Sequence, residues 1–312
     1  MEALAAARRL RARRWTDVFE RPGVLASILI SPAVIFVLAL VGGPLVLAIG
    51  LSFTNATAGE LRGDWIGLEN FRHEWSNPAF QHAVWHTFLF TVISQLVVLV
   101  VAGLLAHALI KDFPGKWFLR FLILLPWAAP IALSLMAWKW MFDTSYSILN
   151  WTLVELGLTS QLEPPQYLAE SKLAMGSVIV VHAWRIIPFA VVIFLAGLAS
   201  IPKEVDDAAA IDGATGFRKF WSVTFPLQLP IATVAVLFGI VFTATDMAVV
   251  YILTQGGPPP SFSTEMVTTW AYKTGIESGS LGAGASISLF LLPVLAVVTI
   301  LMLLFARKTE VS

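Results

Sequence analysis

The amino-acid sequence predicts an all-α membrane protein with six transmembrane helices. Hydrophobic residues make up 57% of its 312 residues and charged residues only 13%, whereas about a quarter of a typical soluble domain is charged. Mean hydropathy is +0.79, and six separate apolar runs reach the ~20 residues that a bilayer core requires. A chain with so few polar residues could not cover a soluble surface, so the composition excludes a soluble enzyme and a disordered chain.

Each apolar run is expected to be helical, because the bilayer interior offers no water to satisfy backbone N–H and C=O groups. The six predicted spans are approximately Leu25–Gly50, Ala83–Ile110, Phe118–Phe142, Leu173–Ala199, Gln228–Leu253 and Leu281–Ala306. The first run is about twice as long as the apolar part of a signal peptide, so we expect it to remain as a helix. The spans predict one membrane domain, residues 25–306, between an N-terminal tail of residues 1–24 and a C-terminal tail of residues 307–312.

Lysine and arginine are distributed unevenly between the predicted loops. Thirteen lie in the two tails and in the loops after the second and fourth spans, against four in the three other loops. Because positively charged loops stay in the cytoplasm, both termini are predicted to be cytoplasmic. The N-terminal tail holds six arginines, and it either contacts the anionic lipid surface or serves topology alone.

Net charge and cysteine content exclude further classes of partner and chemistry. The formal net charge is zero and cysteine is absent, so nothing in the overall charge predicts a nucleic-acid partner, and disulfide or thiolate chemistry is excluded. The sequence has no histidine, aspartate and glutamate cluster with metal-ligand spacing and no nucleophile elbow. We therefore expect a non-enzymatic chain with no catalytic residues and no metal site.

The loop of residues 201–230 has more helix signals than a membrane connection needs. Pro202 can begin a helix, Ala208–Ala210 are strong helix formers, and Gly213 can end the helix. Carboxylates in the first turns favour the positive end of the helix dipole; they are Glu204, Asp206 and Asp207.

A second short helix is predicted in the same loop, from about Ala214 to Trp221 and ending before Pro226. The small side chains of the loop would let a partner surface approach closely. We interpret the loop as a docking element; the alternative is a surface turn with no partner.

This loop resembles the EAA loop of permease subunits in ATP-binding-cassette (ABC) importers. That loop reads Glu-Ala-Ala, three residues, glycine, about nine residues and then Ile-x-Leu-Pro. The matching residues here are Asp207-Ala208-Ala209, Gly213 and Val223-Thr224-Phe225-Pro226, and the Ala-Ile-Asp-Gly-Ala stretch containing Asp212 is also typical. Asp207 replaces the usual glutamate with another carboxylate, and two apolar residues replace the isoleucine and leucine.

Further segments carry the resemblance along most of the chain. DWIGLENF at 64–71 is similar to an outer-loop signature of the sugar-type permeases, and LTQGGP at 253–258 to the end of their fifth core helix. LPWAAP at 125–130 and WKWMFD at 138–143 resemble their third core helix. The combination is most similar to the maltose-permease-like subfamily, on the side of its larger subunit, and implies a type I importer permease bundle.

The resemblance implies partners in a bacterial cytoplasmic membrane. Such a subunit pairs with a second permease, here expected to be a different chain, and the pair rests on two ATPase subunits. An external solute-binding protein delivers the substrate. The chain has no GxxxxGK[ST] phosphate loop, so ATP and Mg²⁺ are expected on the ATPase subunits and no cofactor is expected in this chain.

The resemblance also assigns the docking loop a role in coupling. It would insert into a groove of the ATPase, and ATP-driven closure would switch the helices between inward-open and outward-open states. The expected coupling residues are Glu204, Asp207, Ala208, Ala209, Asp212 and Gly213.

Ionisable side chains inside the predicted spans indicate a candidate solute pathway, because charges are costly in a bilayer core. His182 and Arg185 are three residues apart and share a helix face, as do Thr243 and Asp246. Phe189 lies one turn beyond Arg185. Polar groups of this kind suit sugar hydroxyls, and aromatic rings suit the C–H faces of a sugar.

The resemblance implies the same region as the solute site. In the larger subunit of maltose-type importers, sugar contacts fall in the helices before and after the EAA loop. The matching positions here are His182, Ile186, Phe189, Phe242, Thr243 and Asp246. Histidine, isoleucine and aspartate stand where other side chains serve maltose, so a polyol or another glycoside is expected.

Other interpretations of these residues stay open. Arg185 and Asp246 could form a buried ion pair that holds two helices together, or Arg185 could bind an anionic solute such as a glycerophosphodiester. The ionisable groups could also relay protons in a transporter driven by an ion gradient, although such a carrier needs no ATPase dock. Trp127, Trp138 and Trp140 are interpreted as interfacial or packing residues.

Overall fold

The computed structural model describes residues 22–257 and 261–310 of the chain. The predicted basic tail, up to residue 21, lies outside the described residues, as do residues 258–260 and 311–312. Apart from an isolated antiparallel bridge between Thr54 and Trp65, the regular structure of the described residues is helical. This confirms the predicted all-α class.

The described helices follow one another along the chain with three short π-helical turns, η1 to η3. They are α2 (Pro22–Val37), η1 (Leu38–Gly42), α3 (Gly43–Ser52), α4 (Glu69–Ser76), α5 (Pro78–Ile110), α6 (Lys116–Ala128), α7 (Ile131–Met141), α8 (Ile148–Glu155), α9 (Ser171–Ala199), α10 (Lys203–Ile211), α11 (Gly216–Lys219), η2 (Phe220–Thr224), α12 (Phe225–Ala244), α13 (Met247–Thr254), α14 (Val267–Tyr272), η3 (Lys273–Glu277) and α15 (Leu281–Glu310).

Five uninterrupted helical stretches are long and apolar enough to cross a bilayer, and a bent pair supplies a sixth candidate. The five are residues 23–52, 78–110, 171–199, 216–244 and 281–308. They overlap the first, second, fourth, fifth and sixth predicted spans. The multi-pass character of the chain is therefore confirmed.

The third predicted span, Phe118–Phe142, is not one straight helix. It consists of α6 and α7, which meet at an angle of 97°. The backbone at Ala129 is extended, with φ −71° and ψ 141°, because a residue before proline is pushed out of the helical region. Pro130 also has no N–H to donate, so the helix stops and restarts in a new direction.

The fifth predicted span, Gln228–Leu253, is also wrong as a continuous helix. α12 ends at Ala244, and α13 begins at Met247 with Asp246 as its N-cap. The Asp246 carboxylate accepts a hydrogen bond from the Val249 N–H at 3.4 Å, as aspartate commonly does at a helix start. An ionisable residue thus sits at a helix break inside a predicted membrane segment.

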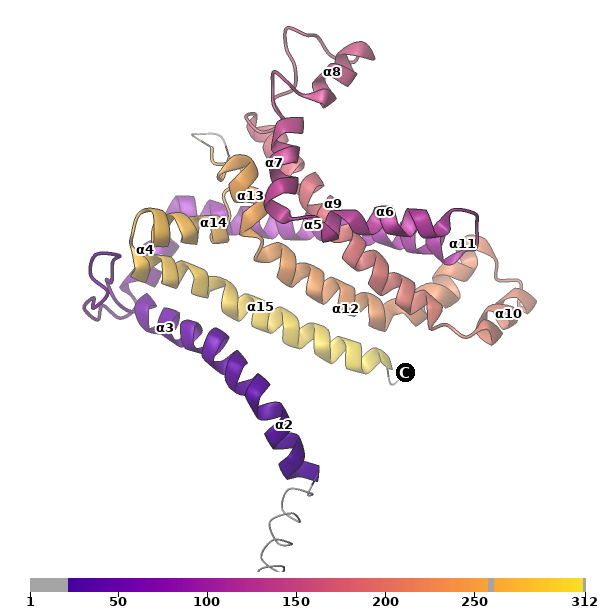
Figure 1. The fold of residues 1–312 in the computed structure, drawn as a ribbon, viewed down its shortest axis with the longest axis horizontal. Helices are drawn as coiled ribbons and strands as arrows, with labels where there is room; N and C mark the ends of the chain where they lie inside the picture. Colours follow the sequence, from indigo (N-terminus) through magenta and orange to yellow (C-terminus); the bar gives the residue numbers. More distant parts are fainter. Residues whose placement is uncertain (1–21, 258–260, 311–312) are drawn as a thin grey trace, which may run out of the picture.

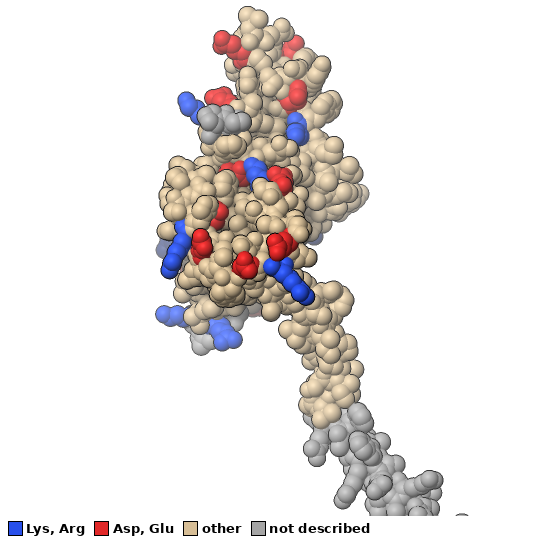
Figure 2. Space-filling view, turned by 90° about the vertical axis from the view of Figure 1, so that its left-hand side faces the viewer, with Lys and Arg blue, Asp and Glu red and all other residues tan. Residues whose placement is uncertain are grey.

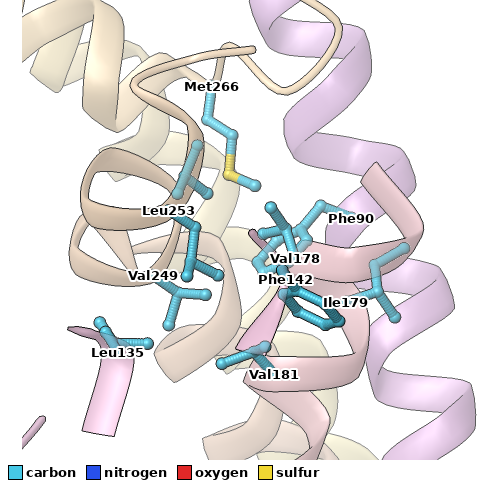
Figure 3. Packing of buried hydrophobic residues seen from close by; sticks show 10 residues of the cluster. Phe90, Leu135, Phe142, Val178, Ile179, Val181, Val249, Leu253 and Met266 are labelled. Atoms are coloured by element: carbon cyan, nitrogen blue, oxygen red, sulfur yellow. The ribbon is translucent and has the colours of Figure 1, made fainter. Parts of the chain in front are cut away.

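The helices α5, α9, α12 and α15 run together through the body of the molecule (Figure 1). One hydrophobic cluster joins Phe90 of α5, Val178 of α9, Val249 of α13 and Met266 just before α14, and the labelled side chains converge in Figure 3. A second cluster joins α5, α9 and α12 around Ile186. These two clusters hold α9 in place between its neighbours.

The first span packs against the rest of the chain only near its C-terminal end. α2 diverges from the other helices in Figure 1, whereas α3 lies beside α15. An apolar window of 18 residues within residues 23–52 contains no buried residue. Figure 2 shows charged side chains of both signs on the body of the molecule and none on the tan, described part of the helix that extends from it. The apolar surface of α2 therefore needs lipid or another subunit to cover it.

Candidate solute pathway and coupling segment

Three of the predicted pathway residues meet in a buried polar cluster between α9 and the α12–α13 break. Nδ1 of His182 lies 2.8 Å from Oδ2 of Asp246, and Nε2 lies 2.9 Å from Oγ1 of Thr243. All three side chains are buried. With the His182 proton on Nδ1, the ring donates to the carboxylate and accepts from the Thr243 hydroxyl, so both ring nitrogens are satisfied.

Arg185 completes this cluster from the next turn of α9. Its Nη2 donates to the same Asp246 oxygen that faces His182. The Arg185 side chain is 20% exposed, and its Nε is buried without a partner among the described residues. The structure thus forms the Arg185–Asp246 ion pair that the sequence left as one of several interpretations, and it leaves Arg185 donors free for a further acceptor.

Asp246 makes contacts with both of its carboxylate oxygens. Oδ1 caps α13, while Oδ2 faces His182 and Arg185. The carboxylate therefore connects α9 to the break between α12 and α13. A change that opened the Oδ2 contacts would free α9 from this break, whereas the Oδ1 cap of α13 involves α13 alone.

The predicted pathway aromatics form a second group, one or two turns away along α9. The Phe189 ring stacks on Trp127 of α6 with centroids 5.2 Å apart, and it meets the edge of Phe242 at 5.5 Å. Phe238 closes the group at 6.0 Å from Phe189. We call Trp127, Phe189, Phe238 and Phe242 the aromatic cluster. Trp127 is 44% exposed and Phe242 36%, so parts of these rings are open to contact.

Trp127 is the member of the aromatic cluster that sequence reasoning assigned elsewhere, to an interface or packing role. It lies three residues before Pro130, in the last turn of α6. The signal that could have found it is the LPWAAP segment itself, because a helix that stops at a proline presents its last turn to a neighbouring helix. Trp138 instead contacts Phe142 and Trp184, which is the packing role that was expected.

Ile186 does not reach an open path in this conformation. It is 1% exposed and lies in the hydrophobic cluster with Val98, Ala183 and Ala190. Ile186 packs in the cluster formed by α5, α9 and α12, whereas the side chain of Arg185 beside it is 20% exposed. The structure therefore brings His182, Arg185, Thr243 and Asp246 together and leaves Ile186 among core residues.

The predicted docking loop folds as a helix, a tight turn and a second helix. α10 ends at Ile211, and Gly213 adopts φ +70°, a conformation that glycine reaches without strain. The Ala214 N–H donates to the Ala209 carbonyl at 2.8 Å, and both alanines are buried. The predicted coupling residues that are exposed are Glu204, Asp207, Ala208, Asp212 and Gly213, with Ala209 facing inward.

The sequence predicted that the second helix of this loop ends before Pro226. In the structure the helix continues past this residue. α11, η2 and α12 form one helical stretch over residues 216–244. The Phe225 N–H bonds to the Phe220 carbonyl five residues back, so the turn is a π-type insertion of the kind that absorbs irregularities in a helix. Pro226, which has no N–H, lies in the first turn after this insertion.

Two large apolar side chains stand out at the tip of the loop. Ile211 is 86% exposed and Phe217 is 78% exposed. Lys219 pairs with Asp206 at 2.8 Å and so connects the helix before the turn to the helix after it. Exposed apolar residues held on a rigid turn are typical of a protein-binding surface. We call residues 203–219 the coupling segment.

The chain is similar to a known protein family and to several transport permeases. Residues 99–311 match the family described as "Binding-protein-dependent transport system inner membrane component". An sn-glycerol-3-phosphate transport system permease protein of Brucella suis is 31% identical over 286 residues, covering 91% of this chain and 95% of the relative. A sulfoquinovosyl glycerol transport system permease protein of Agrobacterium fabrum is 28% identical, covering 95% and 94%.

A further relative and two solved structures are also similar to this chain. A trehalose/maltose transport system permease protein of Thermococcus litoralis is 28% identical, covering 86% of this chain and 89% of the relative. A bacterial ABC transporter involved in alginate import matches with a TM-score of 0.79 at 20% identity, covering 95% of this chain and 99% of that chain. The same fold recurs in a bacterial alginate transporter in complex with a pentasaccharide-bound periplasmic protein, at TM-score 0.74 and 21% identity, covering 96% and 97%. The fold is that of a type I ABC importer permease.

Proposed function

The chain belongs to the family of binding-protein-dependent transport system inner membrane components, and we propose that it moves a sugar, polyol or glycoside as the permease subunit of an ATP-driven importer. The observation that carries this proposal is the coupling segment. Its ordered turn and its exposed Ile211 and Phe217 offer a rigid apolar tip to a separate subunit. A carrier driven by an ion gradient would have no use for such a tip.

The solute class is supported by the chemistry of the pathway and by the relatives. The aromatic cluster offers ring surfaces to C–H faces, and His182, Arg185 and Asp246 would offer donors and acceptors to hydroxyls once their mutual contacts open. The matched permeases carry names that refer to sn-glycerol-3-phosphate, sulfoquinovosyl glycerol and trehalose/maltose. The solutes in these names have in common that each carries more than one hydroxyl group.

An anionic solute is a second candidate that one observation favours. The Arg185 side chain is 20% exposed, and Asp246 pairs with only one of its donors, Nη2. A guanidinium with free donors suits a phosphate or a phosphodiester. A glycerophosphodiester would combine this anionic group with hydroxyls that the neighbouring polar side chains could bind.

We infer the partner subunits from the family and from the exposed apolar surface of the chain. We expect two ATPase subunits, which bind ATP and Mg²⁺, an extracytoplasmic solute-binding protein, and a second permease that differs from this chain. Exposed apolar side chains along α2, such as Leu29 and Ile35, supply surface for that second permease or for lipid. This chain would act without a cofactor and without catalysing a reaction itself.

Alternating access would use the connection that Asp246 makes. In the proposed mechanism, closure of the ATPases pulls on the coupling segment, which continues directly through η2 into α12. Movement of α12 relative to α9 would strain the Arg185–Asp246 pair at the far end of the same helix. Opening of the pair would then free polar groups for the solute in one of the two states.

The experiment that tests the function uses the purified complex in liposomes. The chain is co-expressed with the subunits that its operon neighbours encode, extracted in detergent, and the co-purifying subunits and small molecules are identified. We expect an ATPase among them, and we expect solute uptake to stop when ATP inside the liposomes is exhausted. Uptake that continues without nucleotide and collapses with an ionophore would establish a gradient-driven carrier instead.

A further inference from the structure

A groove in the surface of the molecule shares no lining residue with the predicted pathway or the coupling segment. It has a volume of about 320 Å³ and is formed by the end of α5, the middle of α6 and the end of α9. Nine of its ten lining residues are apolar, and the tenth is Arg120. An apolar groove with one cation at its edge is an amphipathic site.

The charges around this groove favour an anionic occupant. Arg120 donates from Nη2 to the Leu109 carbonyl at 3.3 Å and forms no ion pair among the described residues. Lys116, one turn earlier, is paired with Asp112. Most of the Arg120 donors are therefore free, and a guanidinium in this state matches phosphate oxygens in a two-bond geometry.

The position of the groove is that of a membrane interface. Trp117 in the first turn of α6 is 75% exposed, and exposed tryptophans at helix ends are typical of the headgroup region. The His107 ring of α5 contacts Phe220 at 5.2 Å, and Figure 1 places the start of α6 at the same end of the molecule as α11. The groove thus opens at the side of the membrane on which the coupling segment lies, which the distribution of lysine and arginine predicts to be the cytoplasmic one.

We propose that this groove binds one acyl chain of an anionic phospholipid, with Arg120 holding the headgroup phosphate. The volume suits a flexible acyl chain and not a packed helix, whose diameter with side chains is about 10–12 Å. Basic pockets between membrane helices on the cytoplasmic side bind anionic headgroups by the same chemistry. A bound lipid would fasten α6 to the ends of α5 and α9.

The test measures lipid binding to the intact, co-purified transporter by native mass spectrometry. Phosphatidylglycerol and phosphatidylcholine with identical acyl chains are titrated separately. We expect the parent complex to prefer phosphatidylglycerol, and Arg120→Gln to weaken that binding roughly tenfold, as the loss of one charge-assisted contact predicts. Arg72→Gln, which removes an exposed arginine in α4, should leave binding unchanged.

A second variant tests the apolar half of the site without touching the charge. Ala196 lies on the α9 wall of the groove and is exposed, so Ala196→Phe should fill the groove and weaken binding of both lipids. Ala296→Phe, at an exposed position of α15 outside the groove, is its matched control. Unchanged phosphatidylglycerol binding in both Arg120→Gln and Ala196→Phe would overturn the proposal. So would loss of the second permease from the Ala196→Phe complex with lipid binding intact, since the groove would then be a subunit interface.

Discussion

At the scale of single residues, Asp246 both caps a helix and pairs with charged and polar side chains of another helix. Its carboxylate caps α13 with one oxygen and meets His182 and Arg185 with the other. His182 and Arg185 lie in α9, 64 and 61 residues before Asp246 in the chain, whereas the capped N–H of Val249 lies in α13. A residue in this position couples the break between α12 and α13 to the polar side chains of α9.

Replacement of Asp246 should impair transport more than assembly. In Asp246→Asn the side chain keeps an oxygen for the α13 cap but loses the charge that holds Arg185. We expect the maximal uptake rate to fall roughly tenfold or more, which corresponds to about 1.4 kcal/mol of lost interaction. The measurement is uptake in liposomes beside the yield of the intact complex, with the exposed Asp112→Asn as control. Parental uptake kinetics with a less stable complex would assign Asp246 a purely structural role.

The aromatic cluster permits a matched test with two tryptophans. Trp127 stacks on Phe189, whereas Trp140 of α7 is 68% exposed. We expect Trp127→Ala to raise the solute concentration for half-maximal uptake about three- to tenfold, in line with the energy of one aromatic contact, and Trp127→Phe to have a smaller effect. Trp140→Ala should behave as the parent does. Equal effects of the two alanine variants would show that Trp127 acts only through packing.

At the scale of elements, the coupling segment depends on one backbone conformation. Gly213 at φ +70° lets α10 end and the chain turn back so that Ala214 bonds to Ala209. The same segment then continues through a π turn into α12. The turn and the spanning helix therefore form one mechanical unit, and a defect in the turn is expected to act on α12.

Substitution of Gly213 by proline should abolish ATP-dependent uptake while the chain still inserts into the membrane. Proline holds φ near −65° and cannot adopt the observed turn, whereas Gly213→Asn should keep substantial uptake because asparagine tolerates positive φ. Uptake, membrane level and solute-stimulated ATP hydrolysis are measured together. The control is Gly115→Pro, at another positive-φ glycine in the turn before α6. Undiminished ATP-driven uptake in Gly213→Pro would count against docking through this turn.

At the scale of the whole molecule, two separate parts expose large apolar side chains. One part carries the coupling segment with Ile211 at its tip, and another extended part carries α8 and the loop that contains Leu162 (Figure 1). The distribution of lysine and arginine predicts that the first is cytoplasmic and the second lies outside. Because the chain has no cysteine, each part can be labelled through a single introduced thiol.

Labelling of single-cysteine variants should establish this orientation. Ile211 is 86% exposed and Leu162 is 91% exposed, so Ile211→Cys and Leu162→Cys offer equally accessible thiols. In right-side-out vesicles, we expect a membrane-impermeant maleimide to label Leu162→Cys at once and Ile211→Cys only after permeabilisation. The reverse pattern would contradict the assignment of cytoplasmic termini and, with it, the side on which an ATPase could dock.

The sequence alone determined the membrane class, the approximate location of each span, the family and the coupling segment, because hydropathy and short motifs are properties of neighbouring residues. The tertiary structure decided where two of those spans break, that Trp127 stacks on Phe189, and that Ile186 faces the core. Average hydropathy over about 20 residues does not register a bend at Pro130 or a new helix start at Asp246. The rotation of α9, which separates Ile186 from Arg185, is set by packing against α5 and α12, and no local pattern of residues contains that information.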